Sequence, residues 1–169
     1  IKKYGADILR IWVANSNYVE DIKISYQNLD RQAESYRKIR NTIRFLLGNL
    51  SDYSHQKLPP EHLTELDKWM IVRTQDLQEE IIQDYLNYNF HYAFQKIHNF
   101  CANDLGGFYL DIIKDRLYTS KRDGSARRSA QSAMHQIYTS LLTLVAPILS
   151  FTAEESYLEK NGNGTSIFL

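Results

Sequence analysis

The chain of 169 residues carries 20 basic and 20 acidic side chains, so its formal net charge at pH 7 is zero. This balance argues against a protein that coats nucleic acid by bulk charge, although a local basic surface stays compatible with it. With 43% apolar and 24% charged residues and no apolar run near the roughly 18 residues of a membrane span, the composition predicts one globular domain without a membrane partner.

The only cysteine, Cys101, excludes an internal disulfide and a cysteine-rich zinc site. Because it falls within an apolar helical stripe, we expect a buried structural thiol, which fits a reducing, cytoplasmic location. The first residues hold neither an initiator Met nor a secretory signal. We therefore expect the chain to be a piece of a longer cytoplasmic protein.

Apolar residues recur at helical spacing through nearly the whole chain. The spacing predicts a first helix over residues 4–15, with apolar positions Ile8, Leu9, Ile11, Trp12 and Val13. Residues 21–25 alternate polar and apolar over too few positions for more than a short extended stretch. A long helix over residues 27–50 follows, with an apolar face made of Leu29, Ala33, Tyr36, Ile43, Leu47 and Leu50. Residues 51–60 are predicted as a loop, because Pro59 and Pro60 lack backbone donors.

The next helix is predicted over residues 64–87, with Thr64 as its N-cap and an inner face of Leu66, Met70, Leu77, Ile81 and Tyr85. Residues 87–89 form a hinge. The helix after it has an inward stripe of Phe90, Phe94, Ile97, Cys101, Leu105, Phe108 and Ile112. Gly106 and Gly107 lie inside this helix, where each costs roughly 1 kcal/mol relative to Ala, so we expect a bend or a closely packed neighbouring helix there.

Residues 121–124 are predicted as a turn, after which Ser125 caps a helix that Pro147 ends or kinks. Thr152 and Glu155 have the spacing of a capping box, which predicts the start of a last helix that stops by residues 161–164. The predicted fold is therefore all-α, a helical bundle of about five long helices.

No motif for catalysis is present in the sequence. It contains no glycine-rich phosphate loop and no His-Glu-x-x-His. His91 and His98 could share a helix face, but without a third ligand they do not predict a metal site. Asp111 and Asp115 alternate with Lys114 and Arg116, as in a solvated face with local ion pairs. We predict no catalytic residue, no metal and no cofactor in this chain.

Two groups of cations are candidates for nucleic-acid contacts. Between residues 31 and 44 five cations stand against one anion, Glu34, and Arg37, Arg40, Asn41 and Arg44 form a stripe off the apolar face. A second group extends from Lys114 to Arg128. Guanidinium and amide groups on a rigid helix can contact phosphates and unpaired base edges, and exposed tyrosines can stack on bases. The candidate binding residues are Arg37, Lys38, Arg40, Asn41, Arg44, Lys121, Arg122, Arg127 and Arg128. Charge patterning by itself favours a merely solvated helix face over RNA binding.

Four strings carry a resemblance to a known family. Residues 4–14, which begin Tyr-Gly-Ala-Asp, resemble the segment that follows the catalytic core in class I aminoacyl-tRNA synthetases. Residues 36–50, 104–118 and 146–155 are similar, in the same order, to the helical bundle of isoleucyl-tRNA synthetases. Ser156-Tyr157 departs from the family, which has an apolar residue and Trp there. The class I ATP-binding motifs His-Ile-Gly-His and Lys-Met-Ser-Lys-Ser are absent from these 169 residues.

The resemblance implies that residues 1–26 are a connecting segment after the catalytic core and that residues 27–169 are an anticodon-binding helical bundle. It implies binding of the tRNA(Ile) anticodon stem-loop, which positions the tRNA for ATP-dependent aminoacylation by a parent isoleucine–tRNA ligase. That parent would use ATP with magnesium, and in many members zinc in a C-terminal element. Its catalytic, editing and C-terminal domains would be the partners of this chain, which by itself would be catalytically inactive.

Two other interpretations stay open at this stage. The domain could belong to a valyl- or methionyl-tRNA synthetase, although the strings at residues 108–111 and 114–118 argue against this. It could also be a helical interaction module without RNA binding, with basic faces that are merely solvated.

Overall fold

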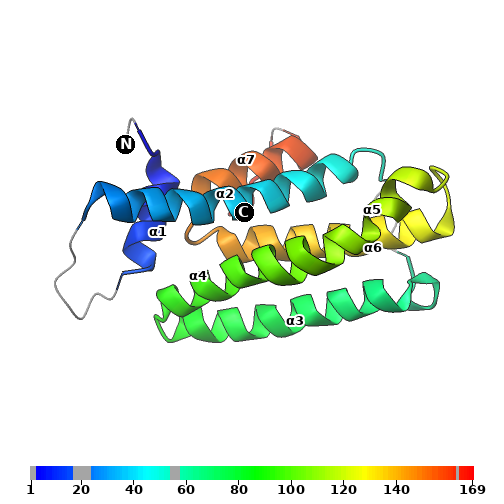
Figure 1. Cartoon of the computed structure of the whole chain (residues 1–169), viewed down its shortest axis with the longest axis horizontal. Coiled ribbons are helices and arrows are strands. Elements are labelled where there is room, and N and C mark those ends of the chain that lie inside the picture. Colours follow the sequence, from blue (N-terminus) through cyan, green and yellow to red (C-terminus); the bar gives the residue numbers. More distant parts are fainter. Residues whose placement is uncertain (1–2, 17–23, 54–57, 163) are drawn as a thin grey trace.

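The computed structural model describes residues 3–16, 24–53, 58–162 and 164–169, and within these ranges it contains helices and no strand (Figure 1). The predicted all-α helical bundle is confirmed. Its elements are α1 (Ala6–Ala14), α2 (Tyr26–Asn49), the short 3-10 turn η1 (Pro60–His62), α3 (Glu65–Leu86), α4 (Phe90–Asn99), the π-helix η2 (Phe100–Tyr109), α5 (Leu110–Thr119), α6 (Ser125–Val145) and α7 (Ser150–Asn161).

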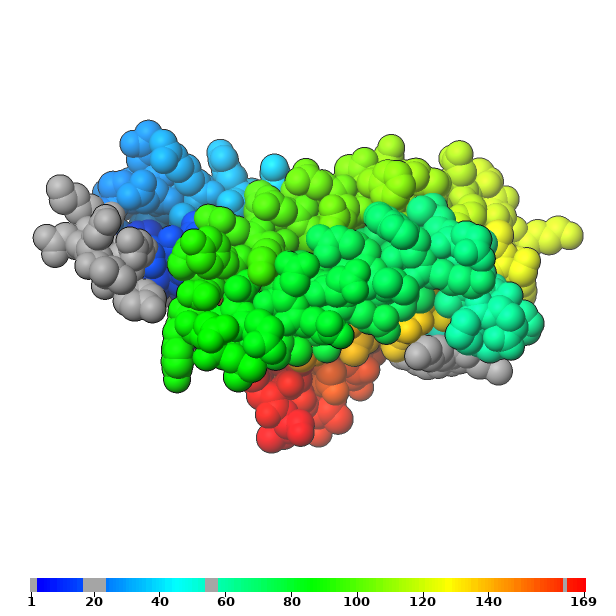
Figure 2. Space-filling model, turned by 90° about the horizontal axis from the view of Figure 1, so that it is seen from below, coloured from blue at the N-terminus to red at the C-terminus, as the bar shows by residue number. Residues whose placement is uncertain are grey.

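The long helices run side by side around α6. Helices α2 and α3 and the continuous rod of α4, η2 and α5 lie along the long axis, while α1 crosses one end and α7 lies beside α2 (Figure 1). Seen from below, α3 covers the face of the bundle, with α7 along one edge (Figure 2). Helix α6 buries 12 of its 21 residues, and its small side chains Ser129, Ala130, Ser132 and Ala133 let neighbouring helices approach closely.

Several local predictions are confirmed. Thr64 is the N-cap of α3, and its Oγ1 accepts a hydrogen bond from the Asp67 N–H at 3.4 Å. The hinge after α3 contains Tyr88 at a φ of 58°, which ends the helix. Helix α6 ends at Val145, two residues before Pro147. Most of the predicted face of α2 is buried, with Tyr36 and Leu47 half-buried. The extended stretch predicted at residues 21–25 lies largely outside the described residues.

Two predicted caps are wrong. Gly124, and not Ser125, occupies the N-cap position of α6, and no side chain caps that helix. Helix α7 begins at Ser150, so Thr152 lies inside its first turn and cannot serve as its N-cap. The carboxylate of Asp7 on α1 does this instead, accepting from the Thr152 N–H at 2.8 Å, the Thr152 Oγ1–H at 2.6 Å and the Phe151 N–H at 3.3 Å. A carboxylate there satisfies free donors and complements the helix dipole.

Helix α1 also binds the other side of the turn between α6 and α7. The Arg10 guanidinium donates from Nε to the Ile148 carbonyl at 2.8 Å and from Nη2 to the Pro147 carbonyl at 2.7 Å. Together with buried Ile8 and Ile11, these bonds make α1 part of the packed bundle. The position of α7 beside α2 therefore depends on two charged residues of α1.

The inward stripe predicted from Phe90 to Ile112 is wrong at its end. It holds through Leu105, but Phe108 is 44% exposed and Ile112 is 49% exposed, while Tyr109 and Ile113 are fully buried. The cause is η2, whose i→i+5 hydrogen bonds widen the turn. In an α-helix, with 3.6 residues per turn, one face alternates steps of three and four. Across the wider π turns, positions four apart stay on one face.

The glycine pair belongs to this π-helix. A Cβ atom on Gly106 would lie 2.9 Å from the carbonyl oxygen of Cys101, and one on Gly107 would lie 3.3 Å from that of Ala102. The atoms nearest to these two positions therefore belong to the chain's own backbone, five residues earlier. They do not belong to a neighbouring helix, which was predicted as the alternative to a bend. Glycine suits this segment because a side chain at Gly106 would press against that carbonyl group.

The buried carboxylate of Asp67 joins four helical elements. It accepts hydrogen bonds from Tyr109 Oη at 2.8 Å in η2, from both terminal nitrogens of Arg116 at 2.9 and 2.8 Å in α5, and from Ser129 Oγ in α6. Thr64 Oγ1, at the start of α3, also donates to it at 2.8 Å. Burial would by itself raise the pKa of Asp67, but these donors outweigh burial and hold that pKa below its ordinary value.

The corrected inward face can be tested with two neighbouring aromatic residues. Phe108→Ala is expected to lower the free energy of unfolding by about 1 kcal/mol, because the ring is half-exposed and contacts Trp69 edge to face, with 5.5 Å between the ring centroids. Tyr109→Ala is expected to cost about 3–5 kcal/mol, since it empties a buried site and removes a donor to Asp67. Urea unfolding measures both, and equal losses would contradict the π-helical register.

The Asp67 cluster predicts an acid-dependent stability. Because the folded-state pKa of Asp67 lies below the ordinary value, its contribution is complete above that ordinary pKa, near 3.9, and is lost as the pH falls toward the folded-state pKa. Asp67→Asn should cost about 3–5 kcal/mol at pH 6, since Arg116 loses its buried partner, and should flatten the loss of stability between pH 5 and pH 2.5. The exposed Asp111→Asn serves as the control, and a cost equal to that of Asp67→Asn would refute this assignment.

Candidate nucleic-acid interface

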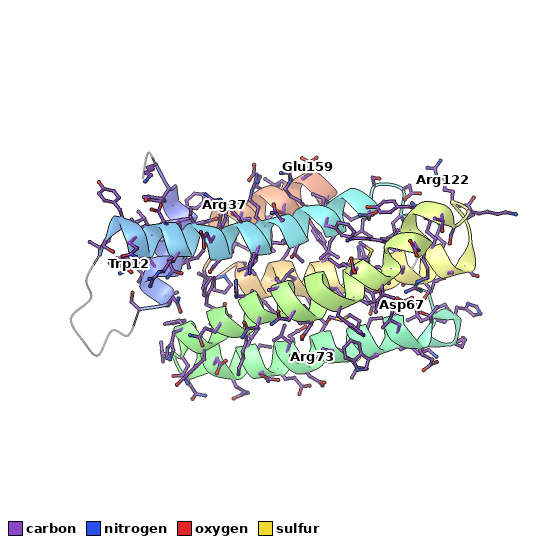
Figure 3. The ribbon with its side chains drawn as sticks, viewed as in Figure 1. Trp12, Arg37, Asp67, Arg73, Arg122 and Glu159 are labelled. Atoms are coloured by element: carbon purple, nitrogen blue, oxygen red, sulfur yellow. The ribbon has the colours of Figure 1, made fainter. Side chains whose placement is uncertain are left out.

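The basic stripe of α2 lies on the outside of the bundle. Buried Ile39, Ile43 and Leu46 fix the inward face of this helix, which leaves the stripe on its outer side. Over the seven residue steps from Arg37 to Arg44 the helix rises about 10 Å. Figure 3 shows Arg37 on the opposite side of the molecule from Arg73 of α3. The α2 stripe, as we define it, consists of Arg37, Lys38, Arg40, Asn41 and Arg44, of which Arg40 is half-buried and the others are exposed.

None of the five side chains of the α2 stripe makes a hydrogen bond or ion pair with another residue in the part of the chain that the structure describes. Four cations held close together without internal partners form a local positive surface on a chain of zero net charge. Such groups are free to bind an external anion, because no internal contact has to break first. The structure thus places Arg37, Arg40, Asn41 and Arg44 together, while Lys38 lies closer to His98 of α4.

Two hollows border the α2 stripe. The α1–α2 hollow, of about 430 Å³, is lined by Lys3, Tyr4, Ile8, Asp30, Ala33, Tyr36, Arg37, Arg40 and Asn41. The α2–α7 hollow, of about 620 Å³, is lined by Arg40, Arg44, Leu47, Gly48, Leu50, Ser51, Tyr53, Thr152, Glu155, Ser156, Glu159 and Lys160. Arg40 lines both hollows, so the stripe is a ridge between two depressions. Extended RNA could follow such a ridge and place bases on either side of it.

Sequence reasoning missed the lining residues from α1 and α7. Glu155, Ser156 and Glu159 are spaced one and four residues apart, which is the signal of one polar helix face. That signal could have identified the face, but not that it lies beside α2. The contact between α2 and α7 is tertiary and includes a hydrogen bond of 3.0 Å between the Tyr36 and Thr152 hydroxyl groups, while Asp7 and Arg10 bind the start of α7 and the turn before it to α1.

Much of the second cation group is engaged within the fold. Arg127 donates to both carboxylate oxygens of Asp52 at 2.7 and 3.0 Å, and Gln131 donates to the same carboxylate at 2.7 Å. Arg128 donates to the Asp52 carbonyl at 3.0 Å and to Asp123 at 2.8 Å. The hydrogen bonds from Arg127 are the main reason that the pKa of Asp52 lies well below its ordinary value. These bonds fasten the segment after α2 to α6.

Lys121 and Arg122 are different from the two arginines of α6. Arg122 is 76% exposed and reaches Asp52 only at 3.3 Å, and exposed Lys121 has no partner among the described residues. Figure 3 shows Arg122 beyond the C-terminal end of α2, at the end of the molecule away from α1. Of the four predicted residues in this second group, these two are therefore accessible to a ligand.

The described residues contain no group of three or more His, Cys, Asp or Glu side chains arranged to hold a metal ion. The prediction that Cys101 is buried is confirmed, and burial raises the pKa of its thiol to about 12, so a thiolate nucleophile does not form near neutral pH. No helix in the described ranges combines the length and apolarity that a membrane crossing needs.

Comparison with known proteins places this arrangement in a family. Residues 67–169 match the anticodon-binding domain of tRNA ligase. The isoleucine–tRNA ligase of Legionella pneumophila (strain Corby) is 51% identical over 172 residues, covering 100% of this chain and 18% of the relative. That of Carboxydothermus hydrogenoformans is 52% identical over 159 residues, covering 93% of this chain and 17% of the relative. The chain therefore spans about a fifth of the length of these curated relatives.

A solved structure supports the fold. The chain superposes with a TM-score of 0.70 on a LeuRS chain from a ternary LeuRS–tRNA–LeuAMS complex of Agrobacterium radiobacter K84, at 16% identity, covering 96% of this chain and 19% of that one. The family match covers more than half of the chain, and the relatives align over nearly all of it. The chain belongs to the family of anticodon-binding domains of tRNA ligases, and over its length it is similar to isoleucine–tRNA ligases.

Proposed function

We propose that this chain binds the anticodon stem-loop of tRNA(Ile) through the α2 stripe. The observation that carries the proposal is that the five side chains of that stripe have no partner among the described residues, in a chain of zero net charge whose Arg116 and Arg127 are paired with carboxylates. Cations that do not stabilise the fold are available for phosphates. Membership of the anticodon-binding family supports RNA as the ligand.

Within a longer isoleucine–tRNA ligase, this binding positions the acceptor end of tRNA(Ile) for ATP-dependent aminoacylation. The chain supplies binding energy and orientation at a distance from the reaction, which lowers the barrier without any reacting group here. In this proposal the parent enzyme uses ATP with magnesium, and zinc in a C-terminal element. Its catalytic, editing and C-terminal domains are the partners of this chain, in the cytoplasm, and residues 1–26 connect the bundle to the catalytic core.

The individual side chains are assigned by their chemistry. Guanidinium and ammonium groups bind phosphates, while the Asn41 amide can donate to and accept from a base edge. Lys121 and Arg122 extend the phosphate contacts toward the far end of the bundle. Arg127 and Arg128 do not contact the RNA directly in this proposal. They bind Asp52, which follows α2, and so fix the position of the end of that helix. The strong similarity to isoleucine–tRNA ligases favours tRNA(Ile) over the tRNAs of valine or methionine.

Salt dependence tests the arginines of the α2 stripe. Each neutralised phosphate releases counterions, so log affinity falls with log salt by about 0.7–0.9 per contact. Arg37→Ala, Arg40→Ala and Arg44→Ala combined should reduce that slope by about two to three units and weaken binding to a tRNA(Ile) anticodon stem-loop. Lys68→Ala with Arg73→Ala, both on α3, is the control, and Figure 3 shows Arg73 on the opposite side of the molecule from Arg37. An unchanged slope in the triple variant would show a merely solvated face, as in an interaction module without RNA binding.

Asn41→Ala should separate base recognition from phosphate binding. Loss of a base-edge contact is expected to cost about 1–3 kcal/mol of binding free energy while the salt slope stays constant, because an amide carries no charge. Fluorescence titration against the cognate stem-loop and one with a shuffled anticodon gives both quantities. If Asn41→Ala weakens binding to both RNAs equally, the amide does not read a base.

The chain alone should not catalyse isoleucine-dependent ATP–pyrophosphate exchange, because it holds no nucleotide-binding motif. The assay is run on repurified protein, with the Cys101→Ala variant as a check that the thiol plays no part. Exchange that copurifies with the chain would contradict the assignment of this segment to tRNA binding alone.

A further inference from the structure

Lys160, in the last turn of α7, is half-buried but has no carboxylate partner. Its Nζ donates a hydrogen bond to the Leu50 carbonyl at 3.4 Å, and it forms no ion pair with any residue that the structure describes. Four of the other six described lysines do pair with a carboxylate, namely Lys3, Lys68, Lys96 and Lys114. The remaining two, Lys38 and Lys121, are exposed. Among the described lysines, Lys160 therefore combines partial burial with the lack of an ion pair.

The side chain of Lys160 borders two hollows. It lines the α2–α7 hollow of about 620 Å³, and it also lines a second hollow of about 320 Å³ between α6, α7 and the residues after α7. The titratable side chains that share this second hollow with it are His135, Tyr138 and Tyr157. Figure 3 shows Glu159, the residue before Lys160, at the outer edge of the molecule. A small molecule can therefore approach Nζ from solvent, although the side chain is half-buried.

The charged groups of the α2–α7 hollow sum to a positive charge. Arg40 and Arg44 line it from α2, and Glu155, Glu159 and Lys160 line it from α7, which makes three cations against two carboxylates. In the described structure, no ion pair joins either carboxylate to any of the three cations. Such a hollow attracts small anions, because its cations outnumber its carboxylates and are not neutralised by direct contact.

Partial burial makes the Lys160 amine less basic. Burial lowers the pKa of the Lys160 ammonium, because removal from water disfavours the charged form and no hydrogen bond to a carboxylate compensates. The opposite holds for Lys96 and Lys114, since hydrogen bonds to Asp84 and Asp111 raise the pKa of these two side chains. At a given pH, a larger fraction of Lys160 than of an ordinary lysine is therefore the neutral amine, which is the nucleophilic form.

We infer that Lys160 is a site of acylation by small acyl phosphates, and that this modification weakens the RNA binding proposed above, on which the second part rests. The neutral Nζ attacks the carbonyl carbon of the acyl phosphate, so that a C–N amide bond forms and the C–O bond to the phosphate group breaks. Inorganic phosphate leaves with the bonding electron pair, and the proton lost from Nζ passes to water. Arg40 and Arg44 in the same hollow attract the anionic donor.

Acylation changes the charge at Lys160 and preserves its contact with the fold. The amide keeps one N–H group, which can still donate to the Leu50 carbonyl. The positive charge is lost, so three cations against two carboxylates become two against two in the α2–α7 hollow. Arg40 and Arg44 also belong to the α2 stripe, and less positive surroundings attract the phosphates of RNA more weakly.

Mapping of acetylated lysines tests the modification site without RNA. The chain is incubated with acetyl phosphate between about pH 7 and pH 10, and the rate at each lysine is measured by peptide mass spectrometry. Near neutral pH, Lys160 should react several times faster than Lys38 and Lys121, and its rate should level off at a lower pH, because it loses its proton first. In concentrated urea, where the fold is lost, the three rates should become similar. A rate at Lys160 no higher than at the two exposed lysines, or an equal preference for Lys160 in the unfolded chain, would overturn the inference.

An uncharged donor tests the choice of acyl phosphates. The N-hydroxysuccinimide ester of acetic acid transfers the same acetyl group but carries no charge. Because the α2–α7 hollow attracts anions, the preference for Lys160 over Lys121 should be larger with acetyl phosphate than with this ester. An equal or smaller preference with acetyl phosphate contradicts the assignment of acyl phosphates as the donor class.

Two replacements of Lys160 test the effect on RNA. Lys160→Gln carries a neutral amide, as an acylated lysine does, whereas Lys160→Arg keeps the charge, and both should melt within a few degrees of the wild type. Lys160→Gln should bind the tRNA(Ile) stem-loop about two- to threefold more weakly than Lys160→Arg, which is the effect of one nearby charge in water. Equal binding by the two variants refutes the effect on RNA binding. An unchanged salt slope in the α2 triple variant would instead refute the RNA surface, while the acetylation map would stand.

Discussion

The bundle depends on one buried carboxylate. Asp67 is inaccessible to solvent, and a buried negative charge is tolerable only when donors surround it. Those donors come from the start of α3 and from η2, α5 and α6, so their positions are fixed together. The π-helical turns of η2 serve this arrangement, because they turn the Tyr109 hydroxyl toward Asp67 and leave Phe108 at the surface. The π-helical segment η2 therefore supplies one of the hydrogen-bond donors that the buried Asp67 carboxylate needs.

At the opposite end of the bundle, two side chains of α1 bind backbone groups of α7 and of the turn before it. Asp7 accepts from the first turn of α7, and Arg10 donates to carbonyl groups in the preceding turn. A carboxylate at a helix start and a guanidinium at free carbonyl groups both satisfy groups that a helix leaves without partners. This places α7 beside α2 and so creates the α2–α7 hollow. A segment expected to be only a connection therefore shapes the surface proposed to bind RNA.

The cations of this chain differ in whether they pair with a carboxylate inside the fold, and this distinguishes structural cations from candidate RNA-binding ones better than local charge density does. Arg116 and Arg127 bind carboxylates that are largely shielded from solvent, where the loss of either partner leaves a charge uncompensated. The cations of the α2 stripe have no such carboxylate in the described structure. Sequence patterning gives both groups the same appearance, since it counts charges along the chain. Their difference arises because α2 turns its stripe outward, while Arg116 faces α3 and Arg127 faces the turn that follows α2.

The sequence by itself determined the features that act within a turn or two of helix. Thr64 caps α3 and Pro147 follows the end of α6 because capping and the missing proline donor are local effects, and the four strings were enough to indicate the family. Only the tertiary structure decided that Asp7 caps α7 across 145 residues, that η2 turns Tyr109 inward, and that Arg127 is paired while Arg40 faces a hollow. Each of these depends on which groups meet in space. Helical periodicity predicts the face that a residue occupies, but it does not identify the residue that lies opposite.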